Sequence, residues 1–398
     1  MKLNLLKMWI VTLVCCAPSA HAQTLTTLHG FGGAPSDGAE SYGGLSSRGG
    51  RLFGATNAGG SADLGAIFSF DIAAGTEALL HSYVGGPGGE FPQSQSLLFA
   101  SGTLYGSITQ GDDTGCGGDG CGNLFTVNPN TGAYKITHKF RGRVGGGNPG
   151  TTLVSAGNTF YGGTDSGGIF NGNCVFEGTD FGCGTIFALN PATNGISKIY
   201  DFQGGADGEG PNDVTYHGGF LYGTTHQSLT PGFGTVFEID LSTNIETVLY
   251  RFSGDPDTGG INPVAGVIYL GGNLYGTTNT GGAVASGGVV FKVDVATGRE
   301  TVLHSFGGSG DASNPGFGAL VYLSGLLYGT TYLGGTQGKG AIYSIDLKTG
   351  SEQVVYSFTG GADGSTPYTG LVEYQGSLYG TTSSGGAAGY GTIYSLAP

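Results

Sequence analysis

The chain has 398 residues, of which 84 are glycine and only 11% are charged, and its formal net charge is −14 at pH 7. A surface this acidic repels phosphate backbones and anionic lipid headgroups, which excludes nucleic acid as a partner and disfavours a membrane surface. No apolar run after residue 22 approaches the roughly 18 residues that a membrane span needs, so we expect no membrane insertion. We also expect a monomer.

The first 22 residues have the pattern of a secretory signal peptide. Two lysines near the start are followed by the apolar stretch 8–17 and by the small-residue sequence Ala20-His21-Ala22, which is typical of a cleavage site. We therefore predict a signal peptide at residues 1–22, a mature chain at residues 23–398, and a secreted or periplasmic location. The signal contains two lysines and no acids, so its removal changes the net charge from −14 to −16.

A five-residue element, most often LYGTT, recurs seven times along the rest of the chain. Each copy is followed by a glycine-rich loop, a second element such as GTIF or GTVF, a polar turn, and an apolar run that ends in His or Tyr, any residue, then Phe or Tyr. Self-similarity at a period near 50 residues is the signature of a repeat architecture. The copies begin at Leu52, Leu104, Phe160, Leu221, Leu274, Leu327 and Leu378.

Each unit contains four short segments with the composition of β-strands. Near the end of the chain the first three are residues 371–374, 378–382 and 392–396, and residues 353–358 are the fourth segment of the preceding unit. All are rich in Val, Ile, Tyr, Phe and Thr and are separated by turns. Adjacent apolar residues, such as the Leu-Tyr of LYGTT, point to opposite faces of a strand, so both faces of each small sheet need cover. Radial packing provides it. We predict an all-β fold, a seven-bladed β-propeller with four-stranded blades.

The two ends of the mature chain predict how the ring closes. The last unit stops at Pro398 after its third strand, whereas residues 24–31 (TLTTLHGF) match the fourth strand of other units, as in residues 301–306 (TVLHSF). The N-terminal strand should therefore complete the C-terminal blade and close a single domain at residues 23–398.

The combined pattern of LYGTT, Gly-Gly, GT[IV][FY] and [HY]-x-F resembles the bacterial exported tandem repeat called GloVer, which is found in choice-of-anchor proteins. The resemblance covers essentially the whole mature chain. It implies a secreted, often surface-anchored repeat protein without an established general activity, so it transfers no catalytic residue. The chain ends at Pro398 without a sorting or membrane tail, which departs from the anchored members.

Four cysteines remain after residue 22, and all lie in or beside the two longest loops between the LYGTT element and the second element. An even number of cysteines in an exported chain indicates disulfides. We expect local pairs, Cys116 with Cys121 and Cys174 with Cys183, each stapling its loop. The alternative is a zinc site, although the spacings match no common ligand pattern.

The loops that vary in length all lie on one face of the predicted propeller, and function tends to reside on variable loops held by a rigid scaffold. One variable position per blade follows the LYGTT element and should ring the mouth of the central channel on this face. These residues either satisfy nearby backbone groups or bind a ligand through directed hydrogen bonds. They are Asn57, Thr109, Asp165, His226, Asn279, Tyr332 and Ser383.

The loops before the first strands carry acids and amides. Asp and Asn hydrogen-bond their own backbone in turns, which is one explanation, and calcium held by carboxylate and carbonyl oxygens is the other. We therefore expect no required cofactor, with Ca²⁺ as a possible ligand of these loops. The residues are Asp207, Asp213, Asp255, Asp257, Asn262, Asp311, Asn314 and Asp363.

Histidines and tyrosines exchange freely at one position in the [HY]-x-F motif. Free exchange within one chain indicates a structural role for a flat, half-buried side chain with one polar edge. The position is occupied by His29, His81, His138, His304, Tyr200, Tyr250 and Tyr356.

A few residues break the repeat pattern in neighbouring blades, as an active site on a symmetric scaffold would. His226 could abstract a proton beside a uronate carboxylate that an arginine neutralises, as in a polysaccharide lyase. Two carboxylates, Asp165 and Asp213, could instead serve a glycoside hydrolase. The alternative is ordinary solvated side chains. The catalytic candidates are His226, Arg251, Arg141, Arg143, Asp165 and Asp213.

No nucleophile elbow, phosphate loop or HExxH metal motif is present in the sequence. The leading hypothesis is therefore an exported binding propeller that recognises a glycan or a protein ligand on its long-loop face. The alternatives are a carbohydrate-active enzyme, lyase before hydrolase, and a structural component of an envelope or matrix.

Overall fold

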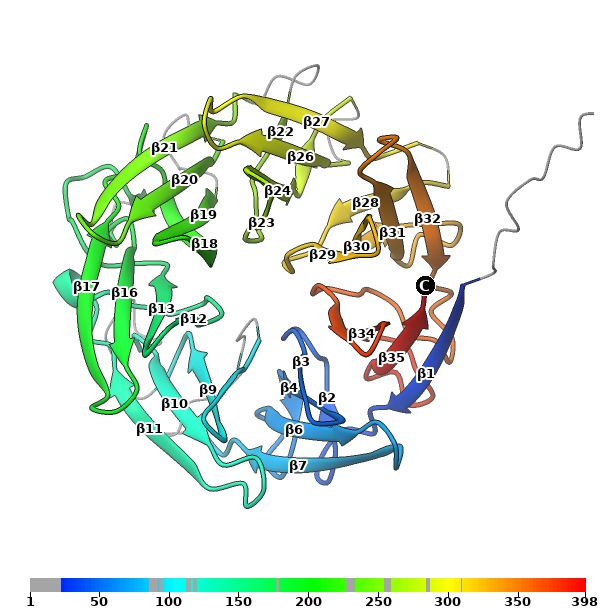
Figure 1. Ribbon diagram of the computed structural model, residues 1–398. Helices are drawn as coiled ribbons and strands as arrows, with labels where there is room; N and C mark the ends of the chain where they lie inside the picture. Colours follow the sequence, from blue (N-terminus) through cyan, green and yellow to red (C-terminus); the bar gives the residue numbers. More distant parts are fainter. Residues whose placement is uncertain are drawn as a thin grey trace, which may run out of the picture.

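The computed structural model describes residues 23–85, 92, 96–111, 116, 120–176, 179–226, 233–253, 259–283, 287–308 and 310–398. Within these residues the chain forms a seven-bladed β-propeller, whose small antiparallel sheets are arranged in a ring around one axis (Figure 1). The predicted fold class is confirmed. The predicted signal peptide and its cleavage site lie outside the described residues.

The seven blades follow one another along the chain, each with its first strand innermost. Blade 1 contains β3 (Ser46–Arg48), β4 (Arg51–Thr56), β6 (Ala66–Asp71) and β7 (Thr76–Ser82); blade 2 contains β8 (Leu98–Ala100), β9 (Thr103–Ile108), β10 (Asn123–Val127) and β11 (Tyr134–Lys139). Blade 3 contains β12 (Val154–Ala156), β13 (Thr159–Thr164), β16 (Thr185–Asn190) and β17 (Gly195–Asp201); blade 4 contains β18 (Glu209–His217), β19 (Phe220–His226), β20 (Thr235–Asp240) and β21 (Ile245–Arg251).

Blade 5 contains β23 (Ile268–Leu270), β24 (Asn273–Thr278), β26 (Val289–Asp294) and β27 (Glu300–Ser305); blade 6 contains β29 (Val321–Leu323), β30 (Leu326–Gly334), β31 (Ala341–Asp346) and β32 (Glu352–Ser357), with β28 (Ala312–Pro315) added on β30. Blade 7 contains β33 (Val372–Tyr374), β34 (Ser377–Thr382), β35 (Thr392–Ala397) and β1 (Thr24–Gly30). In the described parts of the loops, three two-stranded ribbons form, β2 (Gly38–Ala39) with β5 (Ala58–Gly59), β14 (Val175–Phe176) with β15 (Thr179–Asp180), and β22 (Gly260–Ile261) with β25 (Thr280–Gly281), together with a 3-10 turn, η3 (Arg143–Gly145).

The two ends of the described residues 23–398 meet in blade 7, where β1 lies beside β35 (Figure 1). The strands pair antiparallel from Thr24 opposite Ala397 to Gly30 opposite Thr392. Just beyond β1, the amide of Phe31 donates to the Gly391 carbonyl oxygen at 3.0 Å, and the Phe31 side chain is fully buried. The predicted closure by the N-terminal strand is confirmed.

The core lies between the blades as seven apolar clusters. In the cluster between blades 1 and 2, Phe53 and Ile67 pack against Leu104 and Phe125, all nearly or fully buried. The glycine of the LYGTT element makes room for this packing, because a Cβ on Gly106 would collide with the ring of Phe125. The repeated element is thus a packing module, whose leucine fills the interface and whose glycine admits an aromatic ring from the third strand.

A second module joins each blade to the next at the inner rim. Asn262 has a positive φ of 60°, its amide donates to the Phe233 carbonyl oxygen of blade 4 at 3.0 Å, and Pro263 covers Gly234, where any Cβ would collide with the proline ring. Asn tolerates this left-handed conformation better than most residues. The same arrangement recurs at Asn148-Pro149, Gly210-Pro211, Asn314-Pro315 and Thr366-Pro367.

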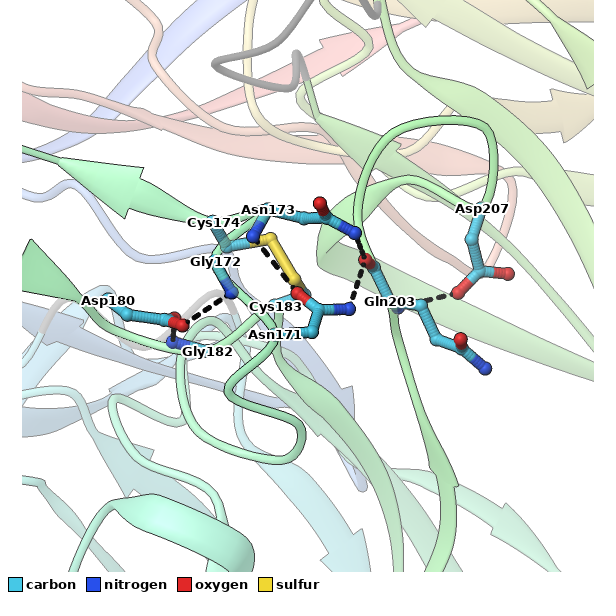
Figure 2. The surroundings of a disulfide bond; sticks show 9 residues. All are labelled: Asn171, Gly172, Asn173, Cys174, Asp180, Gly182, Cys183, Gln203 and Asp207. Atoms are coloured by element: carbon cyan, nitrogen blue, oxygen red, sulfur yellow. Dashed lines mark hydrogen bonds between the residues drawn. A yellow bond between two sulfur atoms is a disulfide. The ribbon is translucent and has the colours of Figure 1, made fainter.

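Both predicted disulfides form, Cys116 with Cys121 and Cys174 with Cys183, with Cα atoms 5.1 and 5.3 Å apart. Figure 2 shows that the Cys174–Cys183 loop is also tied to the connection between blades 3 and 4. The side-chain amides of Asn171 and Asn173 both donate to the Gln203 carbonyl oxygen, at 3.0 and 2.8 Å. The enlarged loop of blade 3 is therefore held against the connection that leads to blade 4.

Candidate functional site

A cavity of about 470 Å³ opens where the second strands of blades 2, 3 and 4 end, beside the inner segments of blades 3 to 6. Three of the predicted ring residues, Thr109, Asp165 and His226, line it together with Asp213. Asn148, Asn212, Asn262 and Phe317 contribute to its wall. The structure thus gathers the carboxylates and the histidine that the sequence singled out into one hollow at the mouth of the channel.

Asp165 and His226 form a hydrogen-bonded pair across two blades. Asp165 follows β13, His226 ends β19, and the imidazole Nε2 lies 2.9 Å from Oδ1 of the carboxylate. The pair faces solvent, since the side chains are 60% and 36% exposed. Desolvation raises the pKa of Asp165, but the hydrogen bond and charge of His226 outweigh it, so the pKa lies below its usual value.

The backbone is shaped to hold the imidazole in this position. Gly210, opposite the end of β19, has a positive φ of 56°, and a Cβ there would overlap the His226 ring. Only glycine allows the ring and this backbone to approach so closely.

Asp213 supplies a second carboxyl group of different character. It lies on the innermost strand of blade 4, β18, and its Oδ1 accepts a hydrogen bond of 2.6 Å from the Thr152 amide of blade 3. Burial raises the pKa of Asp213 to about 6, although the Thr152 amide acts in the opposite direction. The cavity therefore holds two acids whose surroundings move their pKa values apart.

The amide side chains of the wall are held by neighbouring blades. Asn148 donates to the Thr109 carbonyl oxygen at 2.9 Å, and Asn212 donates to the Pro263 carbonyl oxygen at 2.8 Å. Because each amide is anchored before any ligand arrives, little side-chain entropy is lost on binding.

An aromatic group continues the site toward blades 6, 7 and 1. Phe317 lines the cavity and stacks on Tyr368 at 5.1 Å between ring centroids; Tyr332 stacks on the same ring, and Tyr42 meets it edge to face. Tyr332 is also bonded to Asn279, whose Nδ2 lies 3.2 Å from its hydroxyl. The stacked tyrosines thus extend from the Phe317 side of the cavity.

Comparison with protein families shows to which family the chain belongs. A family model for the Gloeobacter/Verrucomicrobia repeat matches residues 15–176 and 175–394. The chain belongs to the Gloeobacter/Verrucomicrobia repeat family. This confirms the resemblance predicted from LYGTT and its companion motifs. No curated protein matches the sequence.

Solved structures similar to this Gloeobacter/Verrucomicrobia repeat protein share its fold at low identity. An oligogalacturonate lyase in complex with manganese is 13% identical, with a TM-score of 0.56, over 94% of this chain and 96% of the other. An oligogalacturonate lyase from Vibrio parahaemolyticus is 10% identical, with a TM-score of 0.59, over 95% and 94%. A chain of the mitotic checkpoint complex is 10% identical, with a TM-score of 0.57, over 99% of each chain. At this identity the likeness shows the propeller fold alone.

Among the other ring residues of this repeat protein, Tyr332 contacts the Asn279 side chain, and Asn279, Ser383 and Asn57 make hydrogen bonds to backbone groups. Asn279 is 9% exposed and donates to the Pro315 carbonyl oxygen at 2.9 Å, and the Ser383 hydroxyl is bonded to the Thr366 carbonyl oxygen. The backbone N–H of Asn57 donates to the Glu40 carbonyl oxygen at 3.0 Å. For Asn279 and Ser383, the predicted role of satisfying nearby backbone groups accounts for these contacts.

The three arginine candidates lie away from the cavity lining. Arg251 ends β21, the outermost strand of blade 4, and its Nε donates to the Ala206 carbonyl oxygen at 2.7 Å. Arg141 and Arg143 are exposed in the connection before blade 3, where Arg143 begins η3. The structure therefore brings together the acids and the histidine but not the arginines.

The loop acids make the turn contacts expected of Asp in loops. Asp207 accepts from the Gln203 amide at 2.7 Å, and Asp363 accepts from the Thr359 amide at 2.8 Å. The Tyr200 hydroxyl donates to the other oxygen of Asp207, and the Tyr356 hydroxyl donates to the same Oδ2 of Asp363 that accepts from Thr359. A side chain with a polar edge is bonded to the loop acid in each case, which explains why His and Tyr exchange in the [HY]-x-F motif. Asp255 and Asp257 lie outside the described residues. The calcium hypothesis remains a prediction.

Sequence reasoning did not single out Asn148, Asn212 or Phe317 as site residues. The signal for Asn148 was the proline that follows it, because an Asn-Pro or Gly-Pro step recurs in the connections that lead into blades 3, 4, 5 and 6. Phe317 has no such signal, because its place at the cavity depends on an inner loop particular to blade 6.

Among the described residues, no helix is long and apolar enough to cross a membrane.

Proposed function

We propose that this protein binds a glycan at the mouth of its channel, on the face that carries the long loops. The observation that carries the proposal is the cavity in which Asp165, His226 and Asp213 face the anchored amide of Asn148 and the ring of Phe317. Sugars are recognised by directed hydrogen bonds from planar polar groups together with packing on an aromatic face, and this wall offers both.

The charge of the wall favours a neutral glycan. Asp165 and Asp213 are carboxylic acids, and no lysine or arginine is among the residues that line the described cavity. A uronate carboxylate would meet like charge there without a cationic partner, which costs binding free energy. Neutral oligosaccharides should therefore bind more tightly than oligogalacturonates.

The test is calorimetric titration with neutral and uronate-containing oligosaccharides. Asp165→Asn and His226→Gln should each weaken binding of a neutral ligand at least about tenfold, the value of one directed hydrogen bond to a charged group. Ser383→Ala, at the same position of blade 7, is the matched control and should bind as the parent does. Equal loss in all three variants, or no loss in any, would contradict a site in this cavity.

A second function, glycoside hydrolysis, is favoured by the divergent pKa values of Asp165 and Asp213. In such a reaction the group with the raised pKa donates a proton to the leaving oxygen and the ionised carboxylate acts as base or nucleophile. The lyase alternative lacks this support, because its arginines lie outside the cavity. The oligogalacturonate lyases share the propeller fold at 10 to 13% identity, which adds no argument about chemistry.

Hydrolysis is tested by measuring new reducing ends, with unsaturated product followed at 235 nm in parallel. Asp213→Asn should abolish new reducing ends while leaving affinity within a few fold, since amide and carboxyl have the same shape. Unsaturated product from a uronate polysaccharide would instead support the lyase reaction.

A further inference from the structure

A cluster of metal-ligating side chains lies far from the cavity, at the outer rim between blades 5 and 6. His304 is the penultimate residue of β27, Asp311 lies in the connection that follows, and Glu352 begins β32 of the next blade. One ligand atom from each residue lies within 4.8 Å of the other two. We propose that His304, Asp311 and Glu352 bind a divalent transition-metal ion.

The geometry of the cluster suits such an ion. Nε2 of His304 lies 3.2 Å from Oδ2 of Asp311. Two ligand atoms that each bind zinc at about 2.1 Å in tetrahedral geometry are roughly 3.4 Å apart, so an ion could replace the hydrogen between them with little movement. Imidazole together with carboxylates suits zinc or manganese better than calcium, which prefers oxygen ligands only.

Unused oxygen atoms point to a missing partner. Oδ1 of Asp311 and Oε1 of Glu352 are both buried and have no hydrogen-bond partner. Oε1 of Glu246, at the position of Glu352 in blade 4, shares this property, so the Asp311 oxygen is the one that distinguishes the cluster. The side chains of His304 and Asp311 are only 22% and 15% exposed, so water satisfies these atoms poorly. A divalent cation would engage the free oxygens and offset the charge of two neighbouring carboxylates.

The same three residue types meet again where the ring closes. His29 on the N-terminal strand β1 lies 3.1 Å from Oδ2 of Asp37, and Glu77 of blade 1 completes the cluster with ligand atoms within 4.8 Å. Oε1 of Glu77 is likewise buried without a hydrogen-bond partner. An ion here would join the N-terminal strand of blade 7 to blade 1, so binding at the two clusters should stabilise the ring against opening.

The chain also contains a natural control for these two clusters. Between blades 3 and 4 the equivalent residues are Tyr200, Asp207 and Glu246, and the tyrosine hydroxyl donates to Asp207 at 3.0 Å. A neutral tyrosine is a poor ligand compared with imidazole, but it fills the same place in the fold. Substituting His by Tyr therefore removes the proposed ligand with a residue that this scaffold already accepts.

The test is zinc binding to the tag-free mature chain, residues 23–398, followed by calorimetry and by metal content after gel filtration. We expect two ions per parent chain, one for His304→Tyr, none for His29→Tyr with His304→Tyr, and three for Tyr200→His. Zinc should raise the melting temperature of the parent and leave that of the double variant unchanged. Calcium should not displace zinc.

Glu352→Gln serves as a second variant that keeps the histidine, and it should also lower the count to one. His217→Ala, a substitution of a histidine that stacks on Tyr269 elsewhere, is the control for adventitious binding and should leave the count at two. A parent that binds no zinc, or a double His→Tyr variant that binds as much as the parent, overturns the proposal. A count that stays at two in Tyr200→His contradicts the claim that this register makes the site.

Discussion

Closure of the ring by the N-terminal strand can be tested with one side chain, Phe31. Its ring is fully buried and packs edge to face on Phe68 of blade 1 at 5.4 Å between centroids. Replacement of a buried phenylalanine by alanine costs about 3–5 kcal/mol through lost transfer free energy and the cavity left behind. For a domain of this length, that loss lowers the melting temperature by roughly 4–6 °C, since unfolding entropy scales with chain length.

The matched control for Phe31→Ala is Phe306→Ala. Phe306 occupies the same position of the [HY]-x-F motif, is fully buried, and packs on Tyr343 at 4.8 Å, but its strand β27 is continuous with the rest of blade 5. Thermal unfolding followed by circular dichroism should show similar losses for the two variants. A near-neutral Phe31→Ala beside a destabilised Phe306→Ala would refute closure by β1. Deletion of residues 23–31 should destabilise the chain further, because it also removes the β1–β35 ladder.

Three further predictions concern pH, backbone and disulfides. Burial raises the pKa of Glu300 to about 7 from 4.5, so the folded chain keeps a proton that the unfolded chain releases. The contribution of Glu300 to stability should be fully present below about pH 4.5 and be lost as the pH rises through 7. Glu300→Gln should therefore reduce the fall in melting temperature over this pH range. Gly210→Ala should displace the His226 ring and weaken ligand binding at least about tenfold in calorimetry, as His226→Gln does, whereas intact binding would contradict the assigned role of this glycine. Replacing Cys174 and Cys183 by serine removes the constraint on a short loop. The free energy of unfolding, measured in denaturant, should fall by roughly 2–3 kcal/mol. An unchanged denaturation midpoint would show that the hydrogen bonds to Gln203 alone hold the loop.

The architecture was predictable because it depends on what every unit repeats. The LYGTT leucines and the third-strand aromatics had to be buried on two faces, and only radial packing covers both. The N-terminal segment that ends at Phe31 matched the fourth strand of other units, which predicted closure. The cysteine pairs followed from insertions in two of seven otherwise equal loops.

The site was predictable only in part, because it depends on what each unit does alone. Asp165 and His226 stood out as departures from the repeat, and the structure places them 2.9 Å apart. Arg251 stood out for the same reason, yet it lies on the outermost strand of its blade. Arg251 is the middle residue of the motif Tyr250-Arg251-Phe252, which marks the end of a fourth strand, so the repeat itself placed it away from the axis.

Other contacts depended on pairing between blades, which no single repeat displays. The exchange of His and Tyr in the [HY]-x-F motif indicated a structural position, and the bond of Tyr200 to Asp207 supplies the reason. The glutamate from the following blade was not visible as a partner, because Glu352 and His304 are 48 residues apart in the sequence. The two residues are close only because the propeller places the outer strands of adjacent blades side by side.

The most direct test of the account is a crystal structure of the mature chain with the neutral oligosaccharide that binds most tightly in the titrations. We predict a sugar ring in the channel-mouth cavity, with hydroxyl groups within hydrogen-bond distance of Asp165, His226 and Asp213 and one face packed on Phe317. A sugar bound on the opposite face or along the outer strands would contradict the proposed site.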